Sequence, residues 1–212
     1  MKPYDTEQDK KEQVREMFDR IAPAYDRLNH TLSFQIDKLW RRHVVRIVRR
    51  MQPRRILDVA TGTGDLALAM ARRMRGVQVL GVDLSENMLA EARRKATACG
   101  LDERVVLSLG DAERLEVADA SVDVVTVAFG VRNFGDLGAG LREIARVLKP
   151  GGTLLICNES NGDTDKDEKW TEIIGGMTIY KDIELKAYLE QAGFHDVQIH
   201  KKKSWLCITA RK

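Results

Sequence analysis

Cysteine is scarce in this 212-residue sequence, which contains only Cys99, Cys157 and Cys207. An odd number of cysteines at such wide spacing argues against a disulfide framework and against a zinc site, and it favours a reducing compartment. The four histidines also lack the spacing to one another, or to a cysteine, that metal ligands show. We therefore expect no metal site.

Long apolar runs are absent as well. The longest, residues 122–131, is interrupted by Asp123 and is far shorter than the ~20 residues of a membrane span. The first twenty residues are charged and contain no apolar stretch, unlike a secretory leader. The net charge is only +3, which does not favour nucleic-acid binding. These features predict a cytoplasmic protein.

The hydrophobic pattern beyond residue 52 alternates between short strands and helices. Segments typical of buried strands occupy residues 55–60, 78–83, 104–109, 123–129, 153–157, 197–200 and 205–210. Helical segments occupy residues 66–74, 85–99, 137–148 and 183–191. This alternation predicts an α/β, Rossmann-like fold: a seven-stranded, mostly parallel sheet with helices on both faces and a C-terminal antiparallel hairpin.

Two helical segments precede this region. We expect residues 1–12 to be frayed and the apolar stripe of residues 14–28 to break near Pro23. Residues 36–51 predict an amphipathic helix with a basic outer face, made of Lys38, Arg41, Arg42, Arg46, Arg49 and Arg50. That face could contact anionic lipid headgroups, at ~1 kcal/mol per cation, or simply be solvated. We predict a helical lid or extension over residues 1–52 and one ligand-binding domain over residues 53–212.

A glycine-rich turn follows the first predicted strand. Glycines at such a turn let the backbone approach a ligand and present N–H groups at the positive end of a helix. The third glycine of the dinucleotide-binding motif is missing, and the sequence contains no P-loop. The cofactor-binding candidates from this turn are Asp58, Thr61, Gly62, Thr63 and Gly64. The alternative is an ordinary strand–helix turn.

Acidic residues end the next two predicted strands. Asp83 stands nineteen residues beyond Gly64, where a carboxylate can bind both hydroxyls of a ribose, although it could instead assist the N-terminus of the following helix. Asp111 could accept a hydrogen bond from the exocyclic amine of adenine, with Ala112 leaving room for the ring, although alone it would be a turn residue. A ligand with ribose and adenine but no pyrophosphate fits S-adenosylmethionine better than NAD.

The order of these motifs resembles that of class I S-adenosylmethionine-dependent methyltransferases. More narrowly, residues 14–152 resemble the ubiquinone/menaquinone biosynthesis C-methyltransferases. The matching segments are residues 17–29, 40–42, 58–65, 83–89, 110–112, 129–134 and 140–152. The resemblance implies S-adenosylmethionine as cofactor, S-adenosylhomocysteine as product, and C-methylation of a demethylated quinol ring. Leu84, Met88 and Ala128 complete the expected cofactor site.

The segment Phe129-Gly-Val-Arg-Asn-Phe134 is the most specific to the quinone branch, and it supplies two catalytic candidates. Arg132 could stabilise a phenolate on the ring or polarise a water that takes a proton, and Asn133 could orient the same oxygen. Tyr25, on the predicted lid, could close over the cofactor. The ordinary alternatives are loop structure for the pair and core packing for Tyr25.

Residues 153–212 depart from this resemblance, as a divergent or chimeric tail would. The quinone enzymes carry a longer apolar insertion after the fifth strand, whereas residues 158–172 here are short and acidic. We expect a small, phenolic and lipid-tailed acceptor, peripheral membrane contact through residues 36–51, and a monomer or homodimer. The alternatives are an O- or N-methyltransferase of another small molecule, or a non-catalytic or engineered hybrid of the fold.

Overall fold

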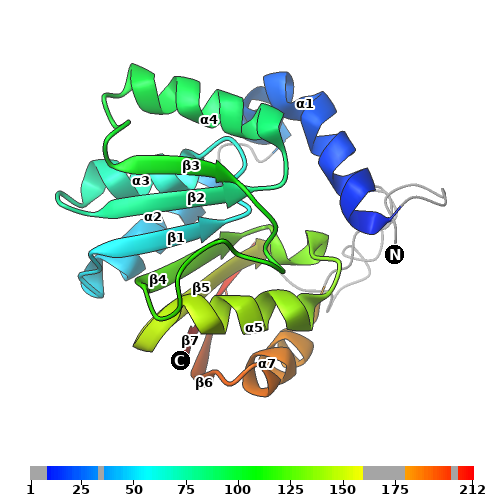
Figure 1. Ribbon diagram of the computed structural model, residues 1–212, viewed down its shortest axis with the longest axis vertical. Coiled ribbons are helices and arrows are strands. Elements are labelled where there is room, and N and C mark those ends of the chain that lie inside the picture. Colours follow the sequence, from blue (N-terminus) through cyan, green and yellow to red (C-terminus); the bar gives the residue numbers. More distant parts are fainter. Residues whose placement is uncertain (1–8, 33–35, 160–179, 202–204) are drawn as a thin grey trace.

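The computed structural model describes residues 9–32, 36–159, 180–201 and 205–212 (Figure 1). Its centre is a seven-stranded sheet in the order β3-β2-β1-β4-β5-β7-β6. The strands are β1 (Arg55–Val59), β2 (Gln78–Asp83), β3 (Val105–Leu109), β4 (Val122–Ala128), β5 (Leu148–Glu159), β6 (His195–Lys201) and β7 (Trp205–Arg211). β7 runs in the direction opposite to the other strands of this sheet, because it pairs antiparallel with both β5 and β6. The Rossmann-like sheet with a C-terminal hairpin is therefore confirmed.

Helices cover both faces of the sheet. The helices α2 (Ile36–Arg50), α3 (Asp65–Arg73) and α4 (Glu86–Ala98) lie on one face, and α5 (Leu137–Val147) and α7 (Asp182–Gln191) lie on the other (Figure 1). The central strand β4 is buried on both sides: Val124 joins the α2–α3 core, and Val125 and Val127 join the α5–α7 core. A nearly continuous apolar strand is what such a doubly covered position requires.

Helix α1 (Lys10–Leu32) packs on α4 and crosses the edge of the sheet toward which the parallel strands point (Figure 1). The expected break near Pro23 is wrong, because α1 runs through this residue. Proline has no N–H for the carbonyl of Asp19, four residues earlier. The side-chain amide of Asn87 donates to that carbonyl instead, at 3.1 Å. A group from α4 thus replaces the missing helical hydrogen bond.

The start of α1 also differs from expectation. The helix begins at Lys10, so the prediction that residues 1–12 are frayed is wrong for residues 10–12. Lys10 and Lys11 are held by contacts to loops that follow β3 and β4, which no local sequence pattern reveals. Residues 1–8 lie outside the described part of the chain, and the division at residue 52 stays a prediction.

The outer face of α2 is basic, with one exception. Lys38, Arg42, Arg46, Arg49 and Arg50 are exposed, as the sequence predicts. Arg41 is instead turned inward, with only 14% of its side chain exposed, because Asp37 and Asp65 both bind its guanidinium. No helix in the described part of the chain is both long enough and apolar enough to span a membrane.

The role assigned to Asn87 predicts a specific stability effect. Replacing Asn87 with alanine should lower the free energy of unfolding by about 1 kcal/mol, a drop of about 2–4 °C in Tm, because the Asp19 carbonyl loses its donor. The loss should shrink in a Pro23→Ala background, where residue 23 regains an N–H for that carbonyl. Thermal unfolding of the parent, the two single variants and the double variant measures both effects. Equal losses in the two backgrounds would contradict the assignment.

Candidate active site

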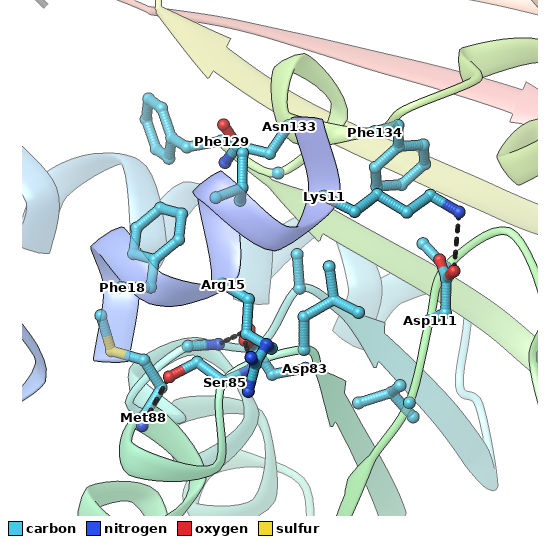
Figure 2. A pocket seen from close by; sticks show the side chains of 18 of the residues that line it. Lys11, Arg15, Phe18, Asp83, Ser85, Met88, Asp111, Phe129, Asn133 and Phe134 are labelled. Atoms are coloured by element: carbon cyan, nitrogen blue, oxygen red, sulfur yellow. Dashed lines mark hydrogen bonds and ion pairs between the residues drawn. The ribbon is translucent and has the colours of Figure 1, made fainter. Parts of the chain in front are cut away.

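A pocket opens at the carboxyl edge of the sheet, beneath α1 (Figure 2). Side chains from α1 form one wall, and the loops after β1, β2, β3 and β4 form the others. The space between these walls is about 780 Å³ when the open mouth is included. The lining includes these residues expected from the sequence: Tyr25, Gly62, Asp83, Leu84, Met88, Asp111, Ala112, Ala128, Arg132 and Asn133.

Asp83 is held rigidly at the end of β2. Its carboxylate accepts hydrogen bonds from the N–H of Gly62 at 2.7 Å and from the N–H of Ser85 at 2.9 Å. Burial raises the pKa of Asp83, and the backbone N–H groups of Ser85, Gly62 and Leu84 oppose that shift. Ser85 in turn caps α4 through the N–H of Met88. Asp83 therefore supports the helix N-terminus and also presents a carboxylate with unused acceptor capacity to the pocket.

Asp111 lies across the pocket from Asp83, in the loop after β3. One of its oxygens accepts from the N–H of Glu113 at 2.9 Å, and the other pairs with Lys11 Nζ at 2.8 Å (Figure 2). Lys11 also pairs with Glu113 at 2.7 Å. Burial would lower the pKa of Lys11, but its bonds to these two carboxylates outweigh burial and raise the pKa. The loop is thus tied to α1.

Four of the predicted residues shape the glycine turn without lining the pocket. The Asp58 carboxylate lies buried under the turn and accepts from the hydroxyls of Thr61 at 2.6 Å and Thr126 at 2.5 Å. Thr63 donates to Asp26 of α1 at 2.5 Å. Gly64 has φ of +75°, and a Cβ there would stand 2.9 Å from the Cβ of Ala92. Glycine is needed at this position for both reasons.

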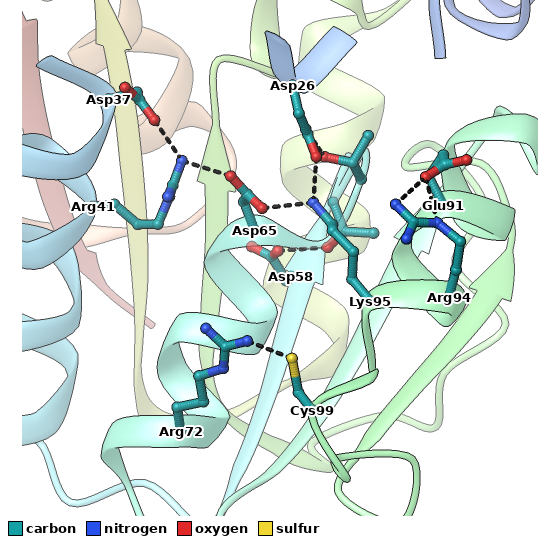
Figure 3. Close-up of polar contacts among 12 residues, drawn as sticks. Asp26, Asp37, Arg41, Asp58, Asp65, Arg72, Glu91, Arg94, Lys95 and Cys99 are labelled. Carbon is teal, nitrogen blue, oxygen red and sulfur yellow. Dashed lines mark hydrogen bonds and ion pairs between the residues drawn. The ribbon is translucent and has the colours of Figure 1, made fainter. Parts of the chain in front are cut away.

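Alternating charges tie four helices around this turn (Figure 3). Asp65, the first residue of α3, pairs with Arg41 of α2 at 2.8 Å and with Lys95 of α4 at 2.6 Å. Lys95 also pairs with Asp26 of α1 at 2.7 Å, and Arg41 pairs with Asp37 at 2.9 Å. Because Arg41 and Lys95 are mostly buried, these pairs are less screened than pairs at the surface.

Arg132 and Asn133 lie in a short 3-10 helix, η1 (Val131–Asn133), that follows β4. The turn before η1 packs tightly on the turn after β1, since a Cβ on Gly130 would stand 2.5 Å from the Cβ of Ala60. Tyr25 reaches the same pocket from α1, and the centroid of its ring lies 6.2 Å from the ring centroid of Phe18. The structure thus brings the three predicted catalytic residues to one pocket, together with Asp83 and Asp111.

A known family matches most of the chain. The model of the ubiE/COQ5 methyltransferase family covers residues 6–171. The chain belongs to the ubiE/COQ5 methyltransferase family. The match extends beyond both ends of the range of residues 14–152 that the motifs predict. Residues 172–212 lie outside the match, although β6 and β7 complete the sheet.

Relatives of this ubiE/COQ5 family member carry methyltransferase names. A demethylmenaquinone methyltransferase of Bacteroides fragilis is 47% identical over 163 residues, which are 77% of this chain and 66% of that protein. One of Thermus thermophilus is 51% identical over 140 residues, 66% of this chain and 63% of that protein. The chain thus spans slightly less than two thirds of the length of these relatives.

Similarity among solved structures concerns the fold alone. The 4+2 cyclase SpnF gives a TM-score of 0.77 at 23% identity, covering 95% of this chain and 96% of that chain. Because 95% of this chain is covered, the similarity in fold includes most of the C-terminal part of this ubiE/COQ5 family member.

Within the described residues, no three histidine, cysteine or acidic side chains gather in a way that could hold a metal ion.

The sequence does not reveal two features of this family member's site. Lys11 lies in a segment that the sequence predicts to be frayed, and no spacing rule connects it to Asp111. The sequence also predicts only part of the apolar walls, to which Phe18, Met88 and Phe134 contribute. The recurrence of Val14, Phe18 and Tyr25 along one stripe was visible in the sequence, but the surface that this stripe covers was not.

The burial of Asp58 predicts a pH-dependent stability. Burial raises the pKa of Asp58 to about 6, with the two threonine hydroxyls opposing the shift. Its pKa in the unfolded chain is about 3.9, so the folded state binds the proton more tightly and loses stability as pH rises from 4 to 6. The stability of Asp58→Asn relative to the parent should therefore increase by up to roughly 3 kcal/mol between pH 4 and 7. Urea unfolding across this range measures it, and a constant difference would contradict the prediction.

Proposed function

We propose that the chain transfers the methyl group of S-adenosylmethionine to a ring carbon of a demethylated quinol. In support of this proposal, one pocket beneath α1 holds Asp83 and Asp111 together with Arg132, Asn133 and Tyr25. Membership in the ubiE/COQ5 family and the names of the relatives support the reaction and the acceptor class.

The residues on one side of the pocket fit the proposed cofactor. The fixed carboxylate of Asp83 has room for donors from a ribose, and Asp111 beside Ala112 offers an acceptor and space for adenine. The Gly62 backbone, at φ of +57°, lets the chain approach the ligand closely. When bound, S-adenosylmethionine supplies an electrophilic methyl group on a sulfonium.

On the other side, η1 supplies the groups for the acceptor. A ring carbon becomes nucleophilic when the neighbouring hydroxyl ionises, so the site needs a cation near that oxygen. Arg132 supplies the charge, and Asn133 supplies an amide to orient the oxygen. A guanidinium group is a poor proton acceptor, so the proton of the ring hydroxyl and the ring proton that leaves after methyl transfer both pass to water. Helix α1 covers this space with Val14, Phe18 and Tyr25, which limits access of other water.

A transfer assay with matched variants tests the proposal. Labelled methyl should pass from S-adenosylmethionine to the ring carbon of a demethylated quinol. Arg132→Met should lower kcat by about 10²–10³-fold, and Arg132→Lys should retain more activity because it keeps the charge. Asp83→Ala should weaken cofactor binding more than tenfold, since two charge-assisted hydrogen bonds of about 1.5–3 kcal/mol each are lost. Calorimetry with S-adenosylhomocysteine measures that affinity separately.

Each alternative gives a different result in the same assay. Methylation of an oxygen or nitrogen would identify an O- or N-methyltransferase. Binding of S-adenosylhomocysteine with no turnover on any phenolic acceptor would identify a non-catalytic scaffold. The short acidic segment at residues 158–172 stands in place of a longer apolar insertion, so it offers less apolar surface to a long quinol tail. We therefore expect that catalytic efficiency does not rise along a series of quinols with increasing tail length.

We further propose that α2 brings the protein to the membrane surface where a lipid-tailed quinol resides. The outer face of α2 carries five exposed basic residues and Leu39, which is 59% exposed. At the buried side of the same helix, Trp40 packs edge-on against Phe129, with ring centroids 5.0 Å apart, and Phe129 lines the pocket. The N-terminal part of α2 therefore adjoins the pocket. The cytoplasmic, peripheral location stays a prediction.

Vesicle sedimentation tests the contact. The chain should bind vesicles rich in anionic lipid and not neutral ones, and binding should fall as salt rises. Replacing Arg42, Arg46 and Arg49 with glutamine should lower the partition coefficient by about two orders of magnitude or more, at ~1 kcal/mol per cation. Equal binding of parent and variant would contradict a role for α2.

A further inference from the structure

Two adjacent lysines at the start of α1 reach different loops of the pocket. Lys10 Nζ donates to the carbonyl of Phe134 at 2.6 Å and to that of Arg132 at 3.2 Å, one on each side of Asn133. Lys11 Nζ binds Asp111 and Glu113 in the loop after β3 (Figure 2). In the first turn of α1, Lys10 therefore contacts the loop proposed to hold the acceptor, and Lys11 contacts the loop proposed to hold the adenine.

The Lys10 contact depends on the conformation of η1. Burial lowers the pKa of Lys10, and the charge of Glu113 opposes that shift. A half-buried ammonium needs acceptors, and the two carbonyls converge on it only while η1 keeps its present turn. Lys10 thus favours the backbone geometry that presents Arg132 and Asn133 to the pocket.

The Lys11 side chain fits closely against Gly135, and its partner Glu113 makes further hydrogen bonds. Glu113, besides pairing with Lys11, accepts from the N–H groups of Gly135 at 2.6 Å and Asp136 at 3.0 Å. Gly135 leaves space for the lysine stem, because a Cβ there would stand 2.9 Å from Lys11 Cε. One oxygen of Asp111 is held by Lys11 and the other by the N–H of Glu113, so Lys11 sets the orientation of that carboxylate.

We propose that Lys10 and Lys11 are positioning residues that couple closure of α1 to the two halves of the site. This inference rests on the proposed function. Lys11 orients Asp111 for the cofactor and holds α1 over it, whereas Lys10 sets the η1 turn for the acceptor. The two lysines therefore act on different kinetic constants. If the two lysines only anchored α1, their substitution would change the stability of the protein and leave both constants unchanged.

Single substitutions in the full chain separate these roles. Lys11→Met should raise the Kd for S-adenosylhomocysteine about fivefold, since two partly exposed ion pairs are lost, and Lys11→Arg should restore it to within about twofold. Lys10→Met should lower kcat about tenfold by misplacing η1, with a much smaller change in that Kd. Arg20→Met is the matched control: it removes a 73% exposed cation that pairs within α1, with Glu16, and should match the parent in both constants.

A second variant keeps the charge and tests the same geometry. Gly135→Ala should raise the Kd for S-adenosylhomocysteine by less than Lys11→Met does, because the new methyl group would stand 2.9 Å from Lys11 Cε and 3.0 Å from Glu113 Oε1 and would shift both side chains. The inference is overturned if the parent binds and turns over, yet the Lys10, Lys11 and Gly135 variants match Arg20→Met in Kd and kcat, whatever happens to their Tm. A parent that does not bind S-adenosylhomocysteine at all would instead refute the proposed function.

Discussion

Alternating charges around Asp65 hold the active edge of this protein together. In the series Asp37, Arg41, Asp65, Lys95 and Asp26, each group neutralises its neighbours, and the members come from α1, α2, α3 and α4. Removing either cation would leave carboxylates of like charge facing each other in a poorly solvated space. Within this series Asp26 and Lys95 tie α1 to α4 beside the pocket, and Thr63 links the glycine turn to the same Asp26 carboxylate.

Much of the fold could be predicted from the sequence because its signals are local. The alternation of apolar strands and helices, the glycine turn and the Ser85 cap placed the sheet and most of its helices to within a few residues. The path of α1 could not be predicted in this way. A proline normally ends or kinks a helix, whereas α1 continues through Pro23, and a tertiary contact from Asn87 supplies the donor that the Asp19 carbonyl lacks.

The site shows the same division. Asp83, Asp111, Arg132 and Asn133 could be located because they follow strand ends, where parallel sheets gather ligand-binding residues. Lys11 could not, since its role arises from a helix that crosses the edge of the sheet. Fold alone does not decide the chemistry either, as the likeness to a cyclase illustrates, and so the reaction has to be argued from the side chains in the pocket.

We propose that one pocket beneath α1 binds the nucleoside of S-adenosylmethionine between Asp83 and Asp111 and turns its methyl group toward Arg132 and Asn133. A crystal structure of the full chain with S-adenosylhomocysteine tests this most directly. In that structure the ribose hydroxyls should lie on the Asp83 carboxylate, the adenine beside Asp111 and Ala112, and the sulfur should face η1. A ligand bound elsewhere, or one whose sulfur faces away from η1, would contradict it.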